Sequence, residues 1–305
     1  MQATLRNEIG LVGIGLHSGR PARLVLRPAT SGGIRFRRTD ISDRDNIVPA
    51  RFDLVSDTTL CTRLSNAAGV SVSTVEHLVA ALAGTGVGHL LVDIDGPEVP
   101  IMDGSAQRFV RAIQKAGLRR LPGCERAIKV LRTVKFAEGD VSCEIRPSEL
   151  PSISFEIDFP DAAIGKHSQT LDLVNGSFVH ELSDCRTFCR RADVEQMQAL
   201  GLALGGSLDN AVVVEGSDVL NADGFRREDE CVRHKMLDAL GDLSLAGAPI
   251  IGAYAGHRAG HGATNRLLRR LMADRDAWQE ITLSPSEAAL LPGAEPRHLN
   301  LRAAV

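Results

Sequence analysis

The chain has 305 residues, enough for two domains at the usual size of roughly 100–200 residues each. Apolar residues make up 44% and charged residues 24%, an ordinary balance for a globular protein with a hydrophobic core. The net charge of −3 and the aromatic content of 4% argue against a basic or base-stacking surface, so we expect no nucleic-acid partner.

Neither the N-terminus nor any apolar run predicts targeting or membrane insertion. The first residues lack the charged and apolar regions of a secretory signal, and no apolar run approaches the ~20 residues that cross a bilayer. The six cysteines contain no C-x-x-C pair and indicate reduced thiols. We therefore expect a cytoplasmic protein without a membrane span.

An internal repeat organises the sequence. In each half, a segment with helical spacing is followed by an apolar β-like run and then by a second helical segment. His77 and Gly84 are seven residues apart in the first half, as are His234 and Gly241 in the second. The corresponding segments are residues 76–84 and 233–241, 88–94 and 248–254, and 103–117 and 260–274.

Alternating β-like runs, at residues 24–38 and 143–159, precede the helices of the two halves. Strands followed by helices predict layered α+β units with the helices on one face of a sheet. Pro122 and Gly123 interrupt the pattern. We therefore predict a first repeat at residues 1–122 and a second at residues 123–305.

Residues 184–220 have no counterpart in the first half. They predict a helix around Val194–Leu200, a glycine-rich turn at residues 205–206 and a β-strand at Ala211–Val214. An excursion of this kind beside a cleft often shapes substrate access. The alternative is that it merely lengthens the sheet.

His234 and Asp238 are four positions apart in a segment with helical apolar spacing, so their side chains share one helix face. Two ligands are too few for a catalytic zinc, which takes three protein ligands and leaves a fourth position open. His77 is the best third candidate, because it occupies the equivalent helix of the first repeat. Packing of the halves helix layer to helix layer would bring both imidazoles to one cleft. The alternative is a solvated pair on one helix and an unrelated histidine on another.

Glu76 adjoins His77 and is a candidate general base close to the metal. The alternative is a capping box between Ser73 and Glu76 at the start of the helix. His261 precedes a helix, whose dipole favours the neutral imidazole, but a carboxylate at Asp242 would keep the ring protonated and oriented. His261 would then be a general acid, unless it is only a surface residue of a flexible loop.

Several motifs, spread in order over nearly the whole chain, resemble those of one family. They are STVEHLVAALAG, PIMDGSAQRFV, RTF, LALGGSLDNAVVV, NADGFRREDECVRHKMLDALGDL and the AGH that ends at His261. Together they resemble the UDP-3-O-acyl-N-acetylglucosamine deacetylases, the zinc enzymes of lipid A synthesis in Gram-negative bacteria.

The resemblance implies an α+β fold of two β-α-α-β units, each with an insert, that face each other through their helices. It implies hydrolysis of the N-acetyl group of a UDP-linked, 3-O-acylated glucosamine, which releases acetate and the free amine. It also implies that His77, His234 and Asp238 bind Zn²⁺, for which Fe²⁺ can compete.

The same resemblance implies roles for five further residues. Glu76 would be the general base, and His261 the general acid with Asp242 behind it. Thr187 would offer its hydroxyl to the carbonyl oxygen, and Lys235 would lie close to the reacting group.

The resemblance also implies a substrate-binding surface. Phe188 would pack near the sugar, and Cys61 would lie near the metal. Phe159 would stack on the uracil ring, and Arg258 would meet the diphosphate. A hydrophobic passage in the second insert would take the acyl chain, and its expected residues are Leu16, Val194, Ala203, Gly206, Ser207 and Val213.

We therefore expect a small amphiphilic UDP-sugar as the binding partner and a monomeric enzyme. Two alternatives stay open at this stage. One is a zinc amidohydrolase with another substrate, which would have no need of an acyl passage. The other is a non-catalytic binding or scaffold protein that keeps the repeat fold.

Overall fold

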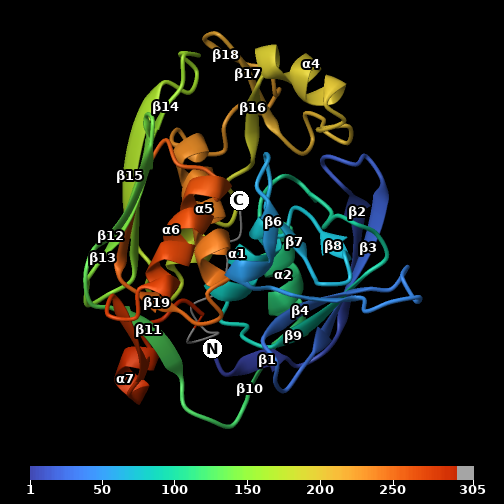
Figure 1. Cartoon of the computed structure of the whole chain (residues 1–305). Helices are drawn as coiled ribbons and strands as arrows, with labels where there is room; N and C mark the ends of the chain where they lie inside the picture. Colours follow the sequence, from blue (N-terminus) through green and yellow to red (C-terminus); the bar gives the residue numbers. More distant parts are fainter. Residues whose placement is uncertain (294–305) are drawn as a thin grey trace.

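The computed structural model describes residues 1–293 and has an α+β architecture, which confirms the predicted fold class. Two five-stranded sheets form the outer layers, and the main helices lie between them (Figure 1). The end of the second predicted repeat, residues 294–305, lies outside the described residues.

The two large sheets have the same strand order. In the first sheet the order β2-β3-β9-β4-β5 corresponds to Ile9–Ile14, Pro21–Pro28, Leu90–Ile94, Ile34–Arg38 and Ile47–Pro49. In the second the order β12-β13-β20-β14-β15 corresponds to Val134–Glu138, Val141–Arg146, Ala253–His257, Ser152–Asp158 and Lys166–Asp172. In both, the central strand is antiparallel to one neighbour and parallel to the other.

Each sheet is covered by its own pair of helices. They are α1 (Glu76–Gly84) and α2 (Gln107–Ala116) in the first half, and α5 (Glu230–Ser244) and α6 (His261–Ala273) in the second. Helix α2 buries one apolar face through Phe109, Val110 and Ile113, as expected for a surface helix. Helix α1 is apolar on nearly all sides and almost fully buried. The face of α1 that points away from the first sheet is covered by helix α5.

Close approach of α1 and α5 requires glycine at one position. A Cβ atom on Gly241 of α5 would lie 2.3 Å from the backbone oxygen of Glu76. The two helices thus meet backbone to backbone beside the first residues of α1. This contact fixes the position of Glu76 and His77 relative to the middle of α5.

The remaining elements form smaller sheets and short helices. Strands β1 and β10 pair at Ala3–Leu5 and Leu118–Arg120, and β19-β11-β21 form a sheet from Ile250–Ile251, Arg126–Val130 and Trp278–Thr282. Strands β6, β7 and β8 are Val55–Asp57, Arg63–Ser65 and Ser71–Val72. The short helices are η1 (Phe52–Leu54), α3 (Ser177–Glu181) and α7 (Pro285–Ala288).

Within residues 1–293, every pair of strands lies on one side of residue 122. This pattern supports the division of the chain that we propose, into residues 1–122 and 123–305. None of the helices in this part of the chain combines the length and apolar character that crossing a bilayer demands.

The segment 184–220 forms a small sheet of its own at one end of the molecule (Figure 1). It contains β16 (Phe188–Arg190), α4 (Arg191–Ala199), β17 (Val212–Glu215) and β18 (Asp218–Val219). The sheet order is β16-β17-β18, so the alternative that this segment lengthens the large sheet is wrong. The predicted helix is present but begins three residues earlier than Val194, at Arg191.

The apolar run at residues 248–254 is not one strand but two. Strand β19 pairs with β11, and β20 enters the large sheet. Gly252 lies at the break, where a Cβ atom would be 2.7 Å from the Val130 side chain and 3.2 Å from the Arg146 backbone oxygen. The chain therefore changes sheets at a position where only glycine fits.

We predict that Gly241→Ala destabilises the protein. Alanine in a helix normally gains about 0.5–1 kcal/mol over glycine, but overpacking against a rigid backbone costs about 1–3 kcal/mol. The free energy of unfolding, measured by chemical denaturation, should therefore fall. Gly96→Ala is the control, because a Cβ atom there meets nothing within 4 Å. Equal stability of both variants would contradict the tight helix contact.

Candidate metal centre and active site

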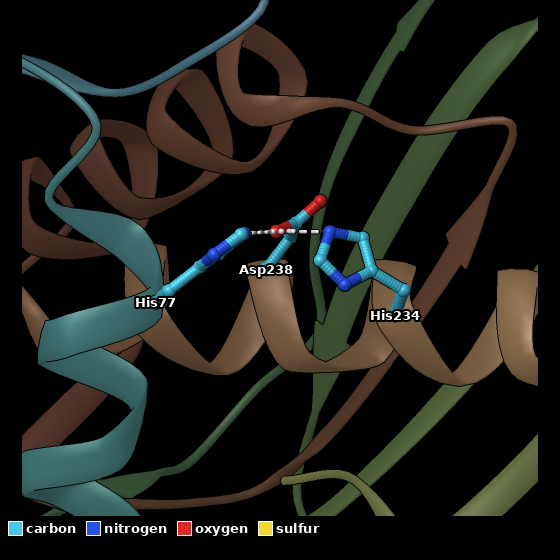
Figure 2. A group of neighbouring side chains, drawn as sticks. All are labelled: His77, His234 and Asp238. Atoms are coloured by element: carbon cyan, nitrogen blue, oxygen red, sulfur yellow. Dashed lines mark ion pairs between the residues drawn. The ribbon is translucent and has the colours of Figure 1, made fainter. Parts of the chain in front are cut away.

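His77, His234 and Asp238 converge where helices α1 and α5 meet (Figure 2). One ligand atom from each lies within 4.8 Å of the others. Asp238 Oδ1 is 3.5 Å from His77 Nε2 and 3.4 Å from His234 Nε2. The two imidazole rings are perpendicular, with centroids 4.9 Å apart. The structure thus brings together the three residues that the sequence predicted as ligands.

The donor atoms fit a cation. Asp238 Oδ1 is buried and has no hydrogen-bond partner among residues 1–293, which is costly for a carboxylate oxygen unless a positive charge lies beside it. The other oxygen, Oδ2, accepts a hydrogen bond of 2.7 Å from Lys235 Nζ. Burial opposes the charge, but the ammonium group of Lys235 holds the pKa of Asp238 well below its usual range. Asp238 therefore presents one ionised, unpaired oxygen to both imidazoles.

A backbone carbonyl fixes the orientation of His234. The carbonyl oxygen of Cys185 lies 3.0 Å from His234 Nδ1, and since a carbonyl only accepts, Nδ1 carries the proton. Nε2 is then the lone-pair nitrogen, the arrangement usual for metal-binding histidines. Burial lowers the pKa of His234 to about 4. The ring is therefore neutral at pH 7, as a metal ligand must be.

His261 and Asp242 form a buried pair beside the ligands. His261 is the first residue of α6, and its Nδ1 donates to Asp242 Oδ2 at 2.8 Å. Burial disfavours the imidazolium, but the charge and hydrogen bond of Asp242, with the charges of Glu76 and Asp238, outweigh burial and raise the pKa of His261 to about 9. The ring is thus protonated at neutral pH. It is buried rather than part of a flexible surface loop.

Glu76 is the first residue of α1 and is 3% exposed. Its Oε2 accepts a hydrogen bond of 2.9 Å from the backbone N–H of Thr62. Helix α1 begins after Val75 and, within residues 1–293, has no side-chain cap, so the capping box with Ser73 is absent. Burial raises the pKa of Glu76, as a carboxylate that accepts a proton near neutral pH requires.

The three candidate ligands, Glu76 and His261 line one cavity of about 660 Å³, whereas Asp242 does not. Such a cavity is large enough for a small-molecule substrate. Its other lining residues among the predicted ones are Leu16, Phe159, Thr187, Phe188 and Lys235.

Comparison with known proteins gives the same family as the motifs. The family model of UDP-3-O-acyl N-acetylglycosamine deacetylase matches residues 2–273. The chain belongs to this deacetylase family. The members are hydrolytic enzymes, and the chain is therefore an enzyme of this class.

Curated relatives with the name UDP-3-O-acyl-N-acetylglucosamine deacetylase match almost end to end. The protein of Phenylobacterium zucineum is 46% identical over 284 residues, which cover 93% of this chain and 97% of the relative. That of Pasteurella multocida is 44% identical over 290 residues, with 94% and 95% covered. That of Vibrio parahaemolyticus is 45% identical over 298 residues, with 97% of each covered.

In this deacetylase, two aromatic rings form the cavity wall beside His234. The ring centroids of Phe159 and Phe188 are 5.4 Å apart at a near-perpendicular angle, and Phe188 is 6.3 Å from the ring of His234. The two phenylalanines therefore form one apolar surface next to the ligands. Phe159 belongs to the loop after β14, and Phe188 begins β16 of the small sheet.

The other predicted residues lie outside the cavity wall. Cys61 is buried. Burial, together with the charge of Glu76, raises the pKa of its thiol to about 12. Arg258 is exposed, after β20. The remaining residues predicted for the acyl passage belong to α4, β17 and the turn between them, at Val194, Ala203, Gly206, Ser207 and Val213.

The turn between α4 and β17 rests on the loop that carries Leu16. The backbone N–H of Gly205 donates to Leu16 O at 2.9 Å, and a Cβ atom on Gly206 would lie 3.7 Å from the Leu16 side chain. Ala203 adopts a left-handed conformation with φ 54°. These residues therefore support the cavity wall at Leu16.

Sequence reasoning missed part of the site. Met197, Leu200 and Leu202 line the cavity from α4 and the turn after it, although their helical pattern was visible in the sequence. Thr62 was also missed. Its hydroxyl donates to Asp242 Oδ1 at 2.6 Å, and its only sequence signal is its place next to Cys61.

We predict that His77→Ala and His234→Ala each lose the bound metal. The intact site should hold about one divalent ion per chain, since three protein ligands suffice for a site with an open position. Metal content after dialysis, measured by elemental mass spectrometry, checks this. His257→Ala is the control, because its half-exposed ring pairs with Glu156 on β14 and lies outside the ligand group. Full occupancy in both ligand variants would contradict the assignment.

Proposed function

We propose that this deacetylase removes the N-acetyl group of UDP-3-O-acyl-N-acetylglucosamine, giving acetate and UDP-3-O-acyl-glucosamine, in lipid A biosynthesis of a Gram-negative bacterium. The observation that carries the proposal is the meeting of a metal-ligand triad, a buried carboxylate and a protonated imidazole in one cavity. The activity for which the relatives are named supplies the substrate.

The ligand set fits Zn²⁺, which takes imidazole and carboxylate ligands, and Fe²⁺ can compete for such a mixed site. We propose Zn²⁺ held by His77, His234 and Asp238. When bound, the ion would polarise the amide carbonyl and make a water molecule more acidic. Lys235 pairs with the second oxygen of Asp238, so we propose that it keeps this ligand ionised while its ammonium group lies in the cavity near the reacting carbonyl.

We propose that Glu76 is the general base. Its carboxylate lines the cavity, and only one of its oxygens is taken by Thr62 N–H. The other oxygen can accept a proton from the water that attacks the acetyl carbonyl. The hydroxyl of Thr187, also on the cavity wall, would donate to the carbonyl oxygen as negative charge develops there.

We propose that His261 is the general acid. Because Nδ1 is engaged by Asp242, the ring presents Nε2 to the cavity. Collapse of the tetrahedral species breaks the C–N bond, and the leaving nitrogen takes the Nε2 proton to become an amine. Asp242 keeps the proton available by raising the pKa of His261 to about 9.

The apolar part of the cavity suits an acyl chain. Leu16, Met197, Leu200 and Leu202 line it, and Leu200 is 70% exposed, so this side reaches the surface. Each buried methylene contributes about 0.8 kcal/mol. We propose that the chain leaves the metal centre along this side, past the turn with Ala203, Gly206 and Ser207 and the elements with Val194 and Val213.

We further propose that the nucleotide lies near the aromatic wall. Phe188 would contact the sugar, Phe159 the uracil ring and Arg258 the diphosphate, with Cys61 packed behind Glu76. We propose a cytoplasmic monomer, because the reaction needs one small amphiphilic substrate and both halves of the site come from one chain.

We predict that the purified protein releases acetate from UDP-3-O-acyl-N-acetylglucosamine. A chelator should abolish the release, and added Zn²⁺ should restore it, because the three ligands hold the ion that polarises the carbonyl. The same UDP-sugar without its acyl chain should react with much lower kcat/KM. Chromatographic measurement of acetate checks each arm.

The control for this assay is Glu76→Gln, which keeps the shape of the side chain. It should bind the metal normally and release acetate about 10²–10⁴-fold more slowly. Undiminished turnover in the presence of chelator would refute the metal mechanism. Equal rates with and without the acyl chain would favour another amide substrate.

We predict an alkaline limb in the dependence of kcat on pH. The raised pKa of His261 means that its proton, and with it the rate, is lost as the pH rises through about 9. In Asp242→Asn the cause of the rise is gone while burial remains, so the limb should move to lower pH. Asp276→Asn, at an exposed carboxylate paired with Arg132, is the control. A limb at the same pH in all three proteins would exclude His261 as the titrating acid.

A further inference from the structure

Thr62 is tied to three parts of the active site at once. The residue is 1% exposed and directly precedes β7. Its N–H donates to Glu76 Oε2 at 2.9 Å, and its hydroxyl donates to Asp242 Oδ1 at 2.6 Å. Its carbonyl accepts from the N–H of Val75 at 3.3 Å, just before α1. No other described residue donates to both carboxylates.

Thr62 therefore binds one oxygen of the Glu76 carboxylate and one oxygen of the Asp242 carboxylate. Asp242 has Oδ1 on the Thr62 hydroxyl and Oδ2 on His261 Nδ1. Glu76 has Oε2 on the Thr62 amide and lines the cavity. A buried carboxylate that loses a donor can rotate about its last bond and is left with an unsatisfied charge. Rotation of Asp242 would turn the ring of His261, and rotation of Glu76 would move its free oxygen.

We propose that Thr62 is a positioning residue that links the general base to the partner of the general acid. It touches no substrate, and it acts by fixing the Asp242 carboxylate with its hydroxyl and the Glu76 carboxylate with its amide. The inference rests on the roles proposed above for Glu76 and His261. Because the amide contact survives any substitution except proline, the hydroxyl contact with Asp242 is the part that mutation can test.

The experiment compares Thr62→Val, which replaces the hydroxyl by a methyl group, with Thr62→Ser, which keeps it. Thr62→Val should lower kcat about 10–100-fold, with KM and metal content near the wild-type values, and Thr62→Ser should restore most of the rate. Thr85→Val is the matched control. Its threonine is also fully buried, but the hydroxyl donates to Ala81 O at 2.6 Å at the far end of α1.

A double-mutant cycle with Asp242→Ala separates positioning from general destabilisation. If Thr62 acts through Asp242, Thr62→Val should cost nothing further in the Asp242→Ala background. The same cost in both backgrounds, or Thr62→Ser as slow as Thr62→Val, would overturn the proposal.

A readout without substrate keeps this inference separable from the proposed reaction. The proton on His261 Nδ1, assigned by its loss in His261→Ala, should give a low-field NMR resonance in the wild-type protein and in Thr62→Ser. In Thr62→Val it should move upfield or exchange with water. An unchanged resonance would overturn the positioning role, whatever the enzyme hydrolyses. Absence of acetate release from the wild type, with the NMR shift present, would instead refute the substrate alone.

Discussion

The contact between α1 and α5 is the constraint on which the site depends. The three residues that could hold a metal ion come from two halves of the chain that each carry a complete sheet, and neither half alone holds all three. The ligand atoms can meet only because Gly241 lets the α5 backbone reach the Glu76 carbonyl. The interface that buries α1 therefore also places His77 opposite His234 and Asp238 (Figure 2). The packing of α1 on α5 and the geometry of the site therefore depend on the same contact.

That interface buries several ionisable groups, and their arrangement explains how this is tolerated. Isolated buried charges are expensive, whereas charges that are paired and hydrogen-bonded are not. Asp242 has a donor on each oxygen, and Asp238 has Lys235 on one. Asp238 Oδ1 has no hydrogen-bond partner within residues 1–293, and neither has Nδ1 of His77 beside it. A metal ion there would pair with the unpaired oxygen, so this oxygen is the strongest indication that the three residues could bind a metal.

The sequence could predict the main helices and the residues that meet between them because both depend on periodicity. Spacing alone puts His234 and Asp238 on one helix face, and the repeat adds His77. Thr62 could not be found in this way, since half of its role belongs to a backbone N–H and its neighbours in space come from distant elements. The capping box at Ser73 fitted the sequence but failed, because the Glu76 carboxylate turns to Thr62. The break at Gly252 escaped prediction for the same reason: the Val130 side chain that demands glycine is remote in the sequence.

His261 shows how magnitudes decide between opposed effects. Its place at the N-terminus of α6 favours the neutral ring, and so does burial. The helix dipole is worth about 0.3–1 kcal/mol, less than the roughly 1.4 kcal/mol that corresponds to one pKa unit. Burial is the largest single effect and lowers the pKa, but the Asp242 carboxylate at 2.8 Å, together with the charges of Glu76 and Asp238, outweighs it. The pKa of His261 therefore rises to about 9. The N-terminus of α6 opposes the positive charge of His261 but also orients its ring, because the backbone of His261 is held in the first turn of the helix. The position of the His261 ring thus comes from α6 and its charge from Asp242, and the proposed role as general acid requires both.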